Sequence, residues 1–372
     1  MSNKSTLLIS TRKGLITYKK NGNRQWHFSK VDFLGLPVSM AYVDQNNNTW
    51  WACLDHGHWG CKLHKSSDEG RTWNEVAAPQ FPECEFVKEG VPASLNYLWA
   101  MTGKGIGITT ELLIGTDPGG LFKSTDNGNS FELVRGLWDH PSRMEKWFGG
   151  GRDYPGIHSI ILDPDNNDRT LVGISCAGVF ETLDGGKSWE PRNKGLQADF
   201  LPDPNAEVGQ DPHLLVACAS NFDVMWQQNH CGIFRTSDGG NNWHDISDKA
   251  GEANFGFAIA ADSKNDQVAW VVPALSDGIR VAIDNSVCIC RTENGGKSWD
   301  TFRKGLPQGN AFDITYRHAL DQDDESLVFG TTTGNLYLSN DHGESWRSIS
   351  NGYVNLTLSE FLFVFKFIHF FF

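Results

Sequence analysis

The stretch KSSDEGRTW, residues 65–73, is a short polar segment between two apolar runs, with the pattern Ser-x-Asp-x-Gly-x-x-Trp. The hydroxyl and carboxylate of this pattern can bond nearby backbone amides, and its glycine supplies the positive φ of a tight turn. The closing aromatic residue begins the next apolar run and can pack back over the turn. The stretch therefore predicts a tight turn that joins two β-strands.

The pattern is repeated along the chain, with Thr for Ser, Asn for Asp or Phe for Trp in some copies. Six copies begin at residues 66, 124, 182, 236, 292 and 339, so successive copies are 58, 58, 54, 56 and 47 residues apart. Such a period indicates stacked supersecondary units, none of which buries its hydrophobic face alone. The later copies are STDNGNSF (124–131), TLDGGKSW (182–189), TSDGGNNW (236–243), TENGGKSW (292–299) and SNDHGESW (339–346).

Strand-like runs surround each copy. LLIGT, GGLFKS and FELVR flank the second copy, and a further apolar run such as HSIILD precedes each unit. Four strands per unit are typical of a propeller blade. The stretch LLISTRKGLITYKKNGNRQW (7–26) aligns with residues 112–131 and keeps the aromatic place at Trp26. We therefore expect an all-β, seven-bladed β-propeller with residues 1–358 as a single domain.

The two ends of the chain pose a question of closure. The first unit lacks a strand before it, so a closed propeller without an open edge must take that strand from the segment after Trp346. VNLTLSE could be that strand, and the alternation in EFLFVFKF also suits one. The Phe-rich tail, residues 359–372, has seven phenylalanines between 361 and 372. A frame change at the end of the gene would explain the tail equally well, and an exposed tail of this kind favours aggregation.

Charge and cysteine content limit the classes of partner. The chain has 32 Lys and Arg against 45 Asp and Glu, a net charge of −13, which argues against nucleic acid and anionic membranes. The opening MSNKSTLLIS is polar and leads directly into a strand, so we expect no signal peptide. Eight cysteines without zinc-type spacing then predict reduced thiols in a cytoplasmic protein that has no metal and no cofactor.

These motifs resemble a known group. The repeated turns are similar to those of the Asp-box (BNR repeat) propellers, which include sialidases, xyloglucan-type glycosidases and a photosystem assembly factor. A closer resemblance is to bacterial single-domain sialidase-like, or WD40/YVTN/BNR-like, repeat proteins. The resemblance implies a seven-bladed propeller, but it leaves activity open because fold does not decide function. It rests on STRKGL, GLWDHPSRMEKWFGGGRDYPGIHSI, QDPHLL, NFGFA and AFDITYRHAL.

The acids of the repeated turns are expected to be structural, which leaves the opposite, top face of the propeller for a ligand. Polar and aromatic side chains converge there, and clefts lined in this way are the default ligand site. We expect substrate binding from Arg12, His58, Arg152, Asp153, Arg280 and Arg317, and catalysis from Asp313, Tyr316, His158 and His213.

The catalytic set rests on an alignment of inner strands, SMAYVD, HSIILD, HLLVAC, FAIAAD and DITYRH. Their leading positions place His158, His213 and Asp313 at one height beside the channel. Neutral imidazoles that face a carboxylate can ligate a divalent metal, move a proton or hold an acidic ligand. The alternative is that each histidine only bonds a neighbouring loop. We also expect the insert from 134 to 156 to cover the channel as a partial lid, anchored by Trp138 and Trp147.

Two classes of function follow. The first is a sialidase-like glycoside hydrolase that acts on a glycan or an acidic small molecule at the top of the channel. Sialidases bind a carboxylate with three arginines and use a tyrosine nucleophile, which the resemblance would assign to Tyr316. The chain lacks their Arg-Ile-Pro motif. The second class is a non-catalytic binding or assembly propeller with a protein partner. A carboxylate and a base that face each other over a pocket would favour the enzyme, and groups paired off within loops would favour the scaffold.

Overall fold

The computed structural model describes residues 5–21, 25–106, 109–323, 326–350 and 364–369. Within these ranges there are seven four-stranded antiparallel sheets, which are the blades of a seven-bladed β-propeller. The chain divides into two compact units, Leu36–Leu215 and Met1–Gly35 with Val216–Phe372. Among the described residues, no helix has the length and apolarity needed to cross a membrane.

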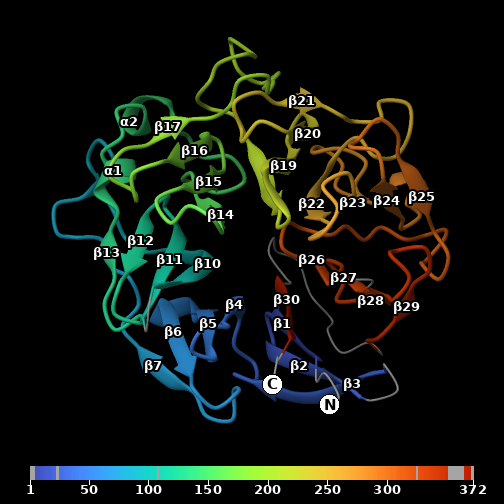
Figure 1. Ribbon diagram of the computed structural model, residues 1–372, viewed down its shortest axis with the longest axis horizontal. Coiled ribbons are helices and arrows are strands. Elements are labelled where there is room, and N and C mark those ends of the chain that lie inside the picture. The colour runs from blue at the N-terminus through green and yellow to red at the C-terminus, as the bar shows by residue number, and fades with distance from the viewer. Residues whose placement is uncertain (1–4, 22–24, 107–108, 324–325, 351–363, 370–372) are drawn as a thin grey trace. The chain divides into compact units, whose positions relative to one another are not determined.

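The unit Leu36–Leu215 contains three of the sheets, and their strands follow chain order (Figure 1). The first is β4 (Val38–Asp44), β5 (Thr49–Asp55), β6 (Cys61–Ser66) and β7 (Asn74–Val76). The second is β10 (Tyr97–Ile106), β11 (Thr109–Asp117), β12 (Leu121–Ser124) and β13 (Glu132–Leu133). The third is β14 (Ile157–Leu162), β15 (Thr170–Ile174), β16 (Gly178–Thr182) and β17 (Glu190–Pro191).

The other unit contains most of the remaining four sheets. One is β18 (Pro212–Cys218), β19 (Asn221–Asn229), β20 (Gly232–Thr236) and β21 (His244–Asp245). The next is β22 (Gly256–Ala261), β23 (Ala269–Pro273), β24 (Ile289–Thr292) and β25 (Asp300–Phe302), with the short 3-10 helix η2 (Ile283–Asn285) between β23 and β24. Another is β26 (Leu320–Asp323), β27 (Ser326–Gly330), β28 (Leu336–Ser339) and β29 (Arg347–Ser348).

The seventh sheet joins the two ends of the described chain. It consists of β1 (Ser5–Thr11), β2 (Gly14–Lys20), β3 (Trp26–Asp32) and β30 (Val364–His369), in the order β3-β2-β1-β30. The expected N-terminal blade is therefore confirmed, and Trp26 is buried at the start of β3. The strand that completes it comes from the Phe-rich segment after Trp346. The other candidate, VNLTLSE, lies outside the described residues, and so do the ends of the tail.

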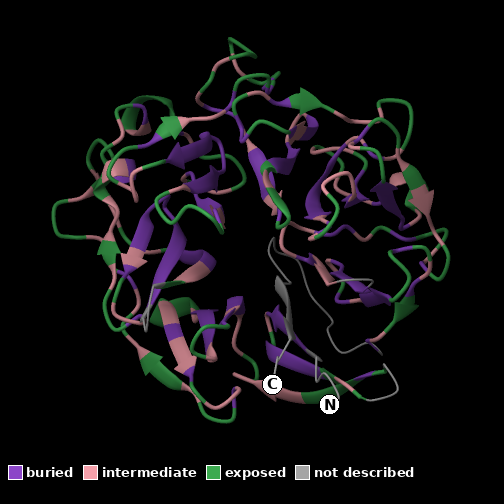
Figure 2. Cartoon of the chain, viewed as in Figure 1, coloured by how far each residue is buried: buried purple, intermediate pink, exposed green. Residues whose placement is uncertain are grey.

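The hydrophobic pattern explains the burial of the strands. The apolar runs LVGI and GVF place every residue of β15 and β16 in the buried class. Fourth strands such as β21 and β29 are short and exposed. Figure 2 shows this contrast between buried strands and exposed turns. In the unit Leu36–Leu215, the side chains of Leu113, Ile174, Phe180 and Trp189 form a core that holds neighbouring sheets together. The strands that contribute to such a core are covered on both faces, and their sequences are therefore continuous apolar runs.

The six repeated turns share one hydrogen-bonding scheme. In the first, Ser66 Oγ accepts a bond from the amide of Gly70 at 2.8 Å, and Asp68 Oδ1 accepts one from the amide of Thr72 at 2.9 Å. The Thr72 hydroxyl also donates to Asp68 Oδ2 at 2.7 Å. The acids are thus occupied within their own turns, as expected. The sequence pattern omitted the last partner, which is Thr72, Ser130, Ser188, Asn242, Ser298 or Ser345 in the six copies.

One expected strand is wrong. The segment DITYRH (313–318) does not begin a sheet, because the first strand of that blade is β26, which starts at Leu320. Instead, the Asp313 carboxylate accepts three hydrogen bonds at 2.9 Å, from Thr331, Thr333 and Asn335. Ile314 exchanges bonds with Thr332. These bonds tie the segment to the loop between β27 and β28, so Asp313 does not lead a first strand as His158 and His213 do.

The insert from 134 to 156 has two parts. Its helices α1 (Arg135–Trp138) and α2 (Arg143–Lys146) lie beside β13 and β17, the last strands of their sheets (Figure 1). Trp138 and Trp147 are buried, as expected for anchors. This placement corrects the expectation that the whole insert forms a lid, because its helices lie beside the last strands of two sheets. Only residues 148–156 lead from the helices to the start of β14. A hairpin of β8 (Phe86–Lys88) and β9 (Val91–Pro92) precedes β10.

Candidate functional site

The upper end of a sheet is defined here as the end at which its second and third strands are joined. The repeated turns join third and fourth strands, so they lie at the opposite end. Strand order places all ten predicted site residues at the upper ends of their own sheets. In the unit Leu36–Leu215 these are His58, Arg152, Asp153, His158 and His213; in the other unit they are Arg12, Arg280, Asp313, Tyr316 and Arg317.

Arg152 is the centre of a cluster at the upper end of the sheet β10-β11-β12-β13. Its Nη1 donates to Asp117 Oδ2 at 2.9 Å. Its guanidinium carbon lies 4.3 Å from the ring centroid of Tyr97 and 4.9 Å from that of Trp99. A planar guanidinium bonds a carboxylate and stacks on aromatic rings at the same time. The arrangement therefore fixes the Arg152 side chain between the start of β10 and the end of β11.

Asp117 is the most perturbed acid of this cluster. Its side chain is buried, and its Oδ1 accepts no hydrogen bond from the described residues. Burial raises the pKa of Asp117, the Arg152 charge lowers it by less, and the nearby Asp153 charge raises it further. A carboxyl group that holds its proton at higher pH than usual can serve as a general acid. Asp153, by contrast, is exposed.

Two groups close to Asp117, the Tyr97 hydroxyl and the Cys61 thiol, keep their protons at physiological pH. Burial raises the pKa of the Tyr97 hydroxyl, and burial together with the Asp55 charge raises the pKa of the Cys61 thiol to about 12. Trp99 contacts the ring of His158 edge-on, with centroids 5.7 Å apart. A Cβ at Gly156 would lie 2.3 Å from the Trp99 ring, so this close approach requires glycine. The site thus combines two acids, Asp117 and Asp153, and the Arg152 cation with aromatic groups.

Sequence reasoning found Arg152, Asp153 and His158 but missed Asp117, Tyr97 and Trp99. Asp117 ends the apolar run of β11, directly before a Pro-Gly-Gly turn. That signal, an acid between a buried strand and a tight upper turn, could have been recognised. The partnership of Asp117 with Arg152 could not, because 35 residues separate them.

The two predicted histidines of this unit are buried and occupied locally. His158 Nδ1 lies 2.9 Å from the Ser159 hydroxyl, whose oxygen accepts a bond from the Leu215 amide at 3.1 Å. His213 Nε2 lies 3.8 Å from Asp211 Oδ2, and Asp211 Oδ1 accepts a bond from the Cys176 amide at 3.0 Å. These bonds connect the starts of β14 and β18. Asp211 and His213 are ligand types that divalent metals accept.

His58 lies on the 3-10 helix η1 (Gly57–Trp59), between β5 and β6. Its ring packs edge-on against Trp59 at 5.4 Å. Trp59 itself is 69% exposed, which is unusual for so large an apolar side chain. An exposed indole ring at the upper end of a sheet offers a flat surface for a ligand.

In the other unit, the structure brings Arg280 and Tyr316 together. Arg280 Nη2 lies 2.7 Å from Asp277 Oδ1. Burial lowers the pKa of Arg280, but hydrogen bonds with Tyr316 and Asp277 outweigh this and raise it overall. Phe257 packs against both, with its centroid 4.7 Å from that of Tyr316 and 5.4 Å from the Arg280 guanidinium carbon.

The remaining predicted residues of this unit are Arg12, Asp313 and Arg317. Asp313 is held by Thr331, Thr333 and Asn335, as described above. Arg12 lies in the turn between β1 and β2, next to Lys13, whose amide bonds the Thr11 hydroxyl at 3.0 Å. Arg317 lies in the turn before β26 with a φ of 27°. The roles assigned to these residues stay predictions.

Comparison with known proteins gives distant relatives. No family model matches the chain. The oligoxyloglucan-reducing end-specific xyloglucanase of Emericella nidulans is 24% identical over 314 residues, which cover 76% of this chain and 35% of that protein. A probable enzyme of the same description from Neosartorya fischeri is 22% identical over 280 residues, covering 66% and 31%. The chain thus spans about a third of the length of these relatives.

Solved structures resemble the fold. The GH74 enzyme of Niastella koreensis superposes with a TM-score of 0.58 at 15% identity, covering 91% of this chain and 51% of that one. YCF48 bound to D1 peptide gives 0.51 at 14% identity, covering 85% and 84%. A putative 6-phosphogluconolactonase from Bacteroides uniformis gives 0.57 at 10% identity, covering 99% and 100%.

These likenesses define the class as seven-bladed β-propeller proteins, with sequence similarity to xyloglucanases. Identities this low establish the fold and no activity. Membership of the Asp-box family stays a prediction.

Proposed function

We propose that this chain binds glycans and cleaves a glycosidic bond at the Arg152–Asp117 cluster. The observation that carries the proposal is the buried position of the Asp117 carboxyl group beside Arg152. It is a buried carboxyl group whose pKa is raised, tethered through Oδ2 and with no hydrogen-bond donor from the described residues at Oδ1. Most glycoside hydrolases need one such acid to protonate the leaving oxygen, beside a second, ionised carboxylate.

The neighbouring residues supply the other functions of such a site. Asp153 is exposed and close enough to affect the pKa of Asp117, so it is the candidate for the second carboxylate, as base or nucleophile. Arg152 orients Asp117 and limits its pKa rise. The exposed Trp59 ring offers a stacking surface for a sugar. Because Oδ1 is buried, the proposal requires residues 148–156 to move before a substrate reaches the acid.

The test is turnover of xyloglucan oligosaccharides, the substrate class named for the curated relatives, by wild type and Asp117→Asn. Loss of a general acid lowers kcat by about 100-fold or more. Asp163→Asn, which alters an acid paired with Arg169 in the lower loop after β14, is the matched control. Equal kcat for wild type and Asp117→Asn would refute the assignment, and loss of folding is checked by circular dichroism.

Sialidase-type chemistry on an acidic glycan is the finer form of the proposal. The Arg280–Tyr316 contact supports it, because sialidases pair a tyrosine nucleophile with substrate-binding arginines. Tyr316→Phe should then abolish release of sialic acid from a chromogenic sialoside. Unchanged release would exclude Tyr316 as the nucleophile.

A non-catalytic scaffold is the second candidate. It is favoured by Asp313, whose Oδ2 accepts three hydrogen bonds from one loop and therefore stabilises structure. A scaffold would bind its ligand or protein partner without turnover. Binding that persists in Asp117→Asn, together with no product from any tested glycan, would establish this candidate.

A further inference from the structure

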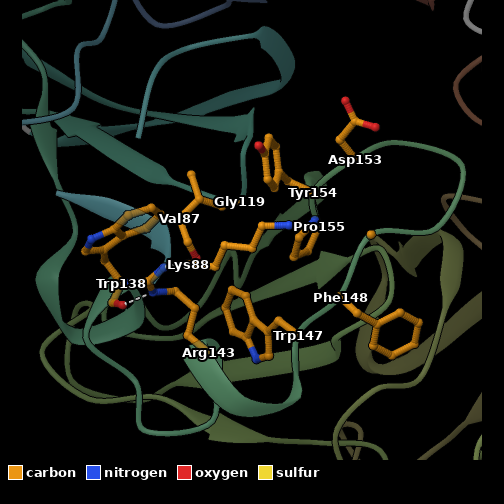
Figure 3. A pocket seen from close by; sticks show the side chains of 11 residues that line it. Val87, Lys88, Gly119, Trp138, Arg143, Trp147, Phe148, Asp153, Tyr154 and Pro155 are labelled. Carbon is orange, nitrogen blue, oxygen red and sulfur yellow. Dashed lines mark hydrogen bonds between the residues drawn. The ribbon is translucent and has the colours of Figure 1, made fainter. Parts of the chain in front are cut away.

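A cavity of about 180 Å³ lies in the unit Leu36–Leu215 between the β8–β9 hairpin and the insert from 134 to 156. Its walls include two cationic side chains, Lys88 and Arg143, and two aromatic rings, Trp147 and Tyr154 (Figure 3). Gly119 also lines it, two residues after Asp117. The cavity therefore adjoins the proposed catalytic cluster and shares Asp153 with it, while its cationic side chains are different ones.

Arg143 is a cation that backbone carbonyl groups hold in place. Its Nη1 donates to the carbonyl oxygens of Phe86 at 3.1 Å and Val87 at 3.2 Å, and its Nε donates to that of Trp138. Its guanidinium carbon lies 3.8 Å from the Trp138 ring centroid. No carboxylate of the described residues lies within ion-pair distance of Arg143. Arginine keeps its charge even when partly buried, and the Glu85 and Asp139 charges act on it only through space, without an ion pair. The cavity wall therefore holds a positive charge that no direct ion pair neutralises.

Lys88 adds a second cation. Its ammonium nitrogen lies 5.4 Å from the Tyr154 ring centroid and forms no ion pair within the described ranges. Figure 3 shows its side chain extending between Trp147 and Tyr154. Asp153 contributes to the lining, but its carboxylate points away from the lysine in the same view. Two unpaired cations at one cavity are notable in a chain with a net charge of −13, because such a site attracts an anion.

We propose that this cavity binds the carboxylate of a uronic acid residue in a glycan, an inference that rests on the proposed glycan function for its sugar component. Lysine and arginine bind carboxylates through charge-assisted hydrogen bonds. The Trp147 and Tyr154 rings provide apolar faces for the sugar ring. A volume of about 180 Å³ is below the roughly 300 Å³ at which drug-sized pockets begin. We therefore expect the cavity to hold one monosaccharide unit and no longer glycan. This unit would lie beside the glycosidic oxygen that Asp117 would protonate.

Titration calorimetry with glucuronate, glucose and glucose 6-phosphate tests the inference. We expect glucuronate to bind, more weakly at high salt, and glucose to show no measurable binding. Lys88→Gln should weaken glucuronate binding about tenfold, the effect of one charge-assisted hydrogen bond. Lys187→Gln, which removes an exposed charge from a repeated turn, is the matched control and should leave binding unchanged.

The outcomes are distinguishable from those of the hydrolase proposal. Glucose binding as tightly as glucuronate, or full affinity in Lys88→Gln, overturns the carboxylate site. Binding of glucose 6-phosphate alone assigns the cavity to phosphate and equally overturns it. Asp117→Asn should keep glucuronate affinity. If glucuronate binds in this cavity but no glycan is cleaved, the hydrolase proposal fails while the carboxylate site stands.

Discussion

The repeated turns show how single residues set local structure and acid response together. Side-chain and backbone hydrogen bonds from Ser130, with one from Ser124, lower the pKa of Asp126 from 3.8 to about 2. Asn294 occupies the same place in another copy. Its Oδ1 accepts a bond from the Ser298 amide at 3.0 Å, and its Nδ2 donates to the Ser298 hydroxyl at 2.8 Å, so this second bond runs in the opposite direction to the one in the Asp126 turn. The geometry of the turn therefore requires a side-chain oxygen at this position, which both Asp and Asn supply. The negative charge of Asp makes the stability of the turn depend on pH as well.

The first prediction concerns Asp126. Because its folded pKa is depressed, its contribution is complete above pH 3.8, the unfolded value, and is lost as the pH falls through about 2. Asp126→Asn should remove this dependence and keep the turn, as Asn294 does. Asp126→Ala should cost about 1 kcal/mol of unfolding free energy at neutral pH, a modest value because the group is exposed. Urea unfolding at several pH values measures both effects, and identical acid profiles for Asn and wild type would contradict the assignment.

The same scale explains what the sequence could predict. Each repeated turn is formed by residues close together in the chain, so the spacing of the pattern predicted the positions of all six turns. The N-terminal unit has no intact copy of the pattern, and the aromatic residue Trp26 identified it. Asp117 and Arg152 meet only through the path of the insert, which no periodicity indicates. Asp313 was misplaced for a related reason. DITYRH has the alternation of a strand, but bonds from Thr331 and Asn335 hold it to a loop instead.

At the scale of elements, the insert from 134 to 156 couples the cavity to the catalytic cluster. Its helices provide Arg143, and the segment that follows provides Arg152 and Tyr154. Gly150 lies where this segment passes the turn after β15. A Cβ there would be 2.4 Å from Cys176 Sγ. Close packing of this kind tolerates no added methyl group without displacement of one side.

Gly150→Ala should therefore displace residues 148–156 and lower stability by about 1–3 kcal/mol. We expect faster amide hydrogen exchange in this segment than in β14, and weaker glucuronate binding. Gly278→Ala is the control, because nothing lies within 4 Å of a Cβ at that position. Equal exchange rates in Gly150→Ala and wild type would contradict this prediction. They would show that the segment accommodates the methyl group without displacement and is packed less tightly than the distance to Cys176 indicates.

At the scale of the whole molecule, the pairing of β30 with β1 links residues far apart in the chain. The register runs from Ser5 opposite His369 to Ser10 opposite Val364. Without β30, one edge of β1 has unpaired backbone groups, which is a recognised route to aggregation. The Phe-rich segment thus supplies a strand to the fold, although its composition alone favoured a non-native tail equally.

Truncation after Ser350 tests this role. We expect the thermal midpoint to fall by roughly 5 °C or more and light scattering to detect aggregates. Truncation after His369 keeps β30 and is the matched control. A chain that ends at Ser350 and remains monomeric with an unchanged midpoint would show that β1 needs no partner on that edge.

The β30–β1 pairing also has a consequence for synthesis. On the ribosome β1 is synthesised before the strands of the other six sheets, and β30 is synthesised after them. The sheet that contains both strands cannot be completed until β30 has left the exit tunnel, so β1 must wait with an open edge for the time taken to make the intervening residues, at about 5–20 residues per second. This interval is the period in which the nascent chain depends most on chaperones.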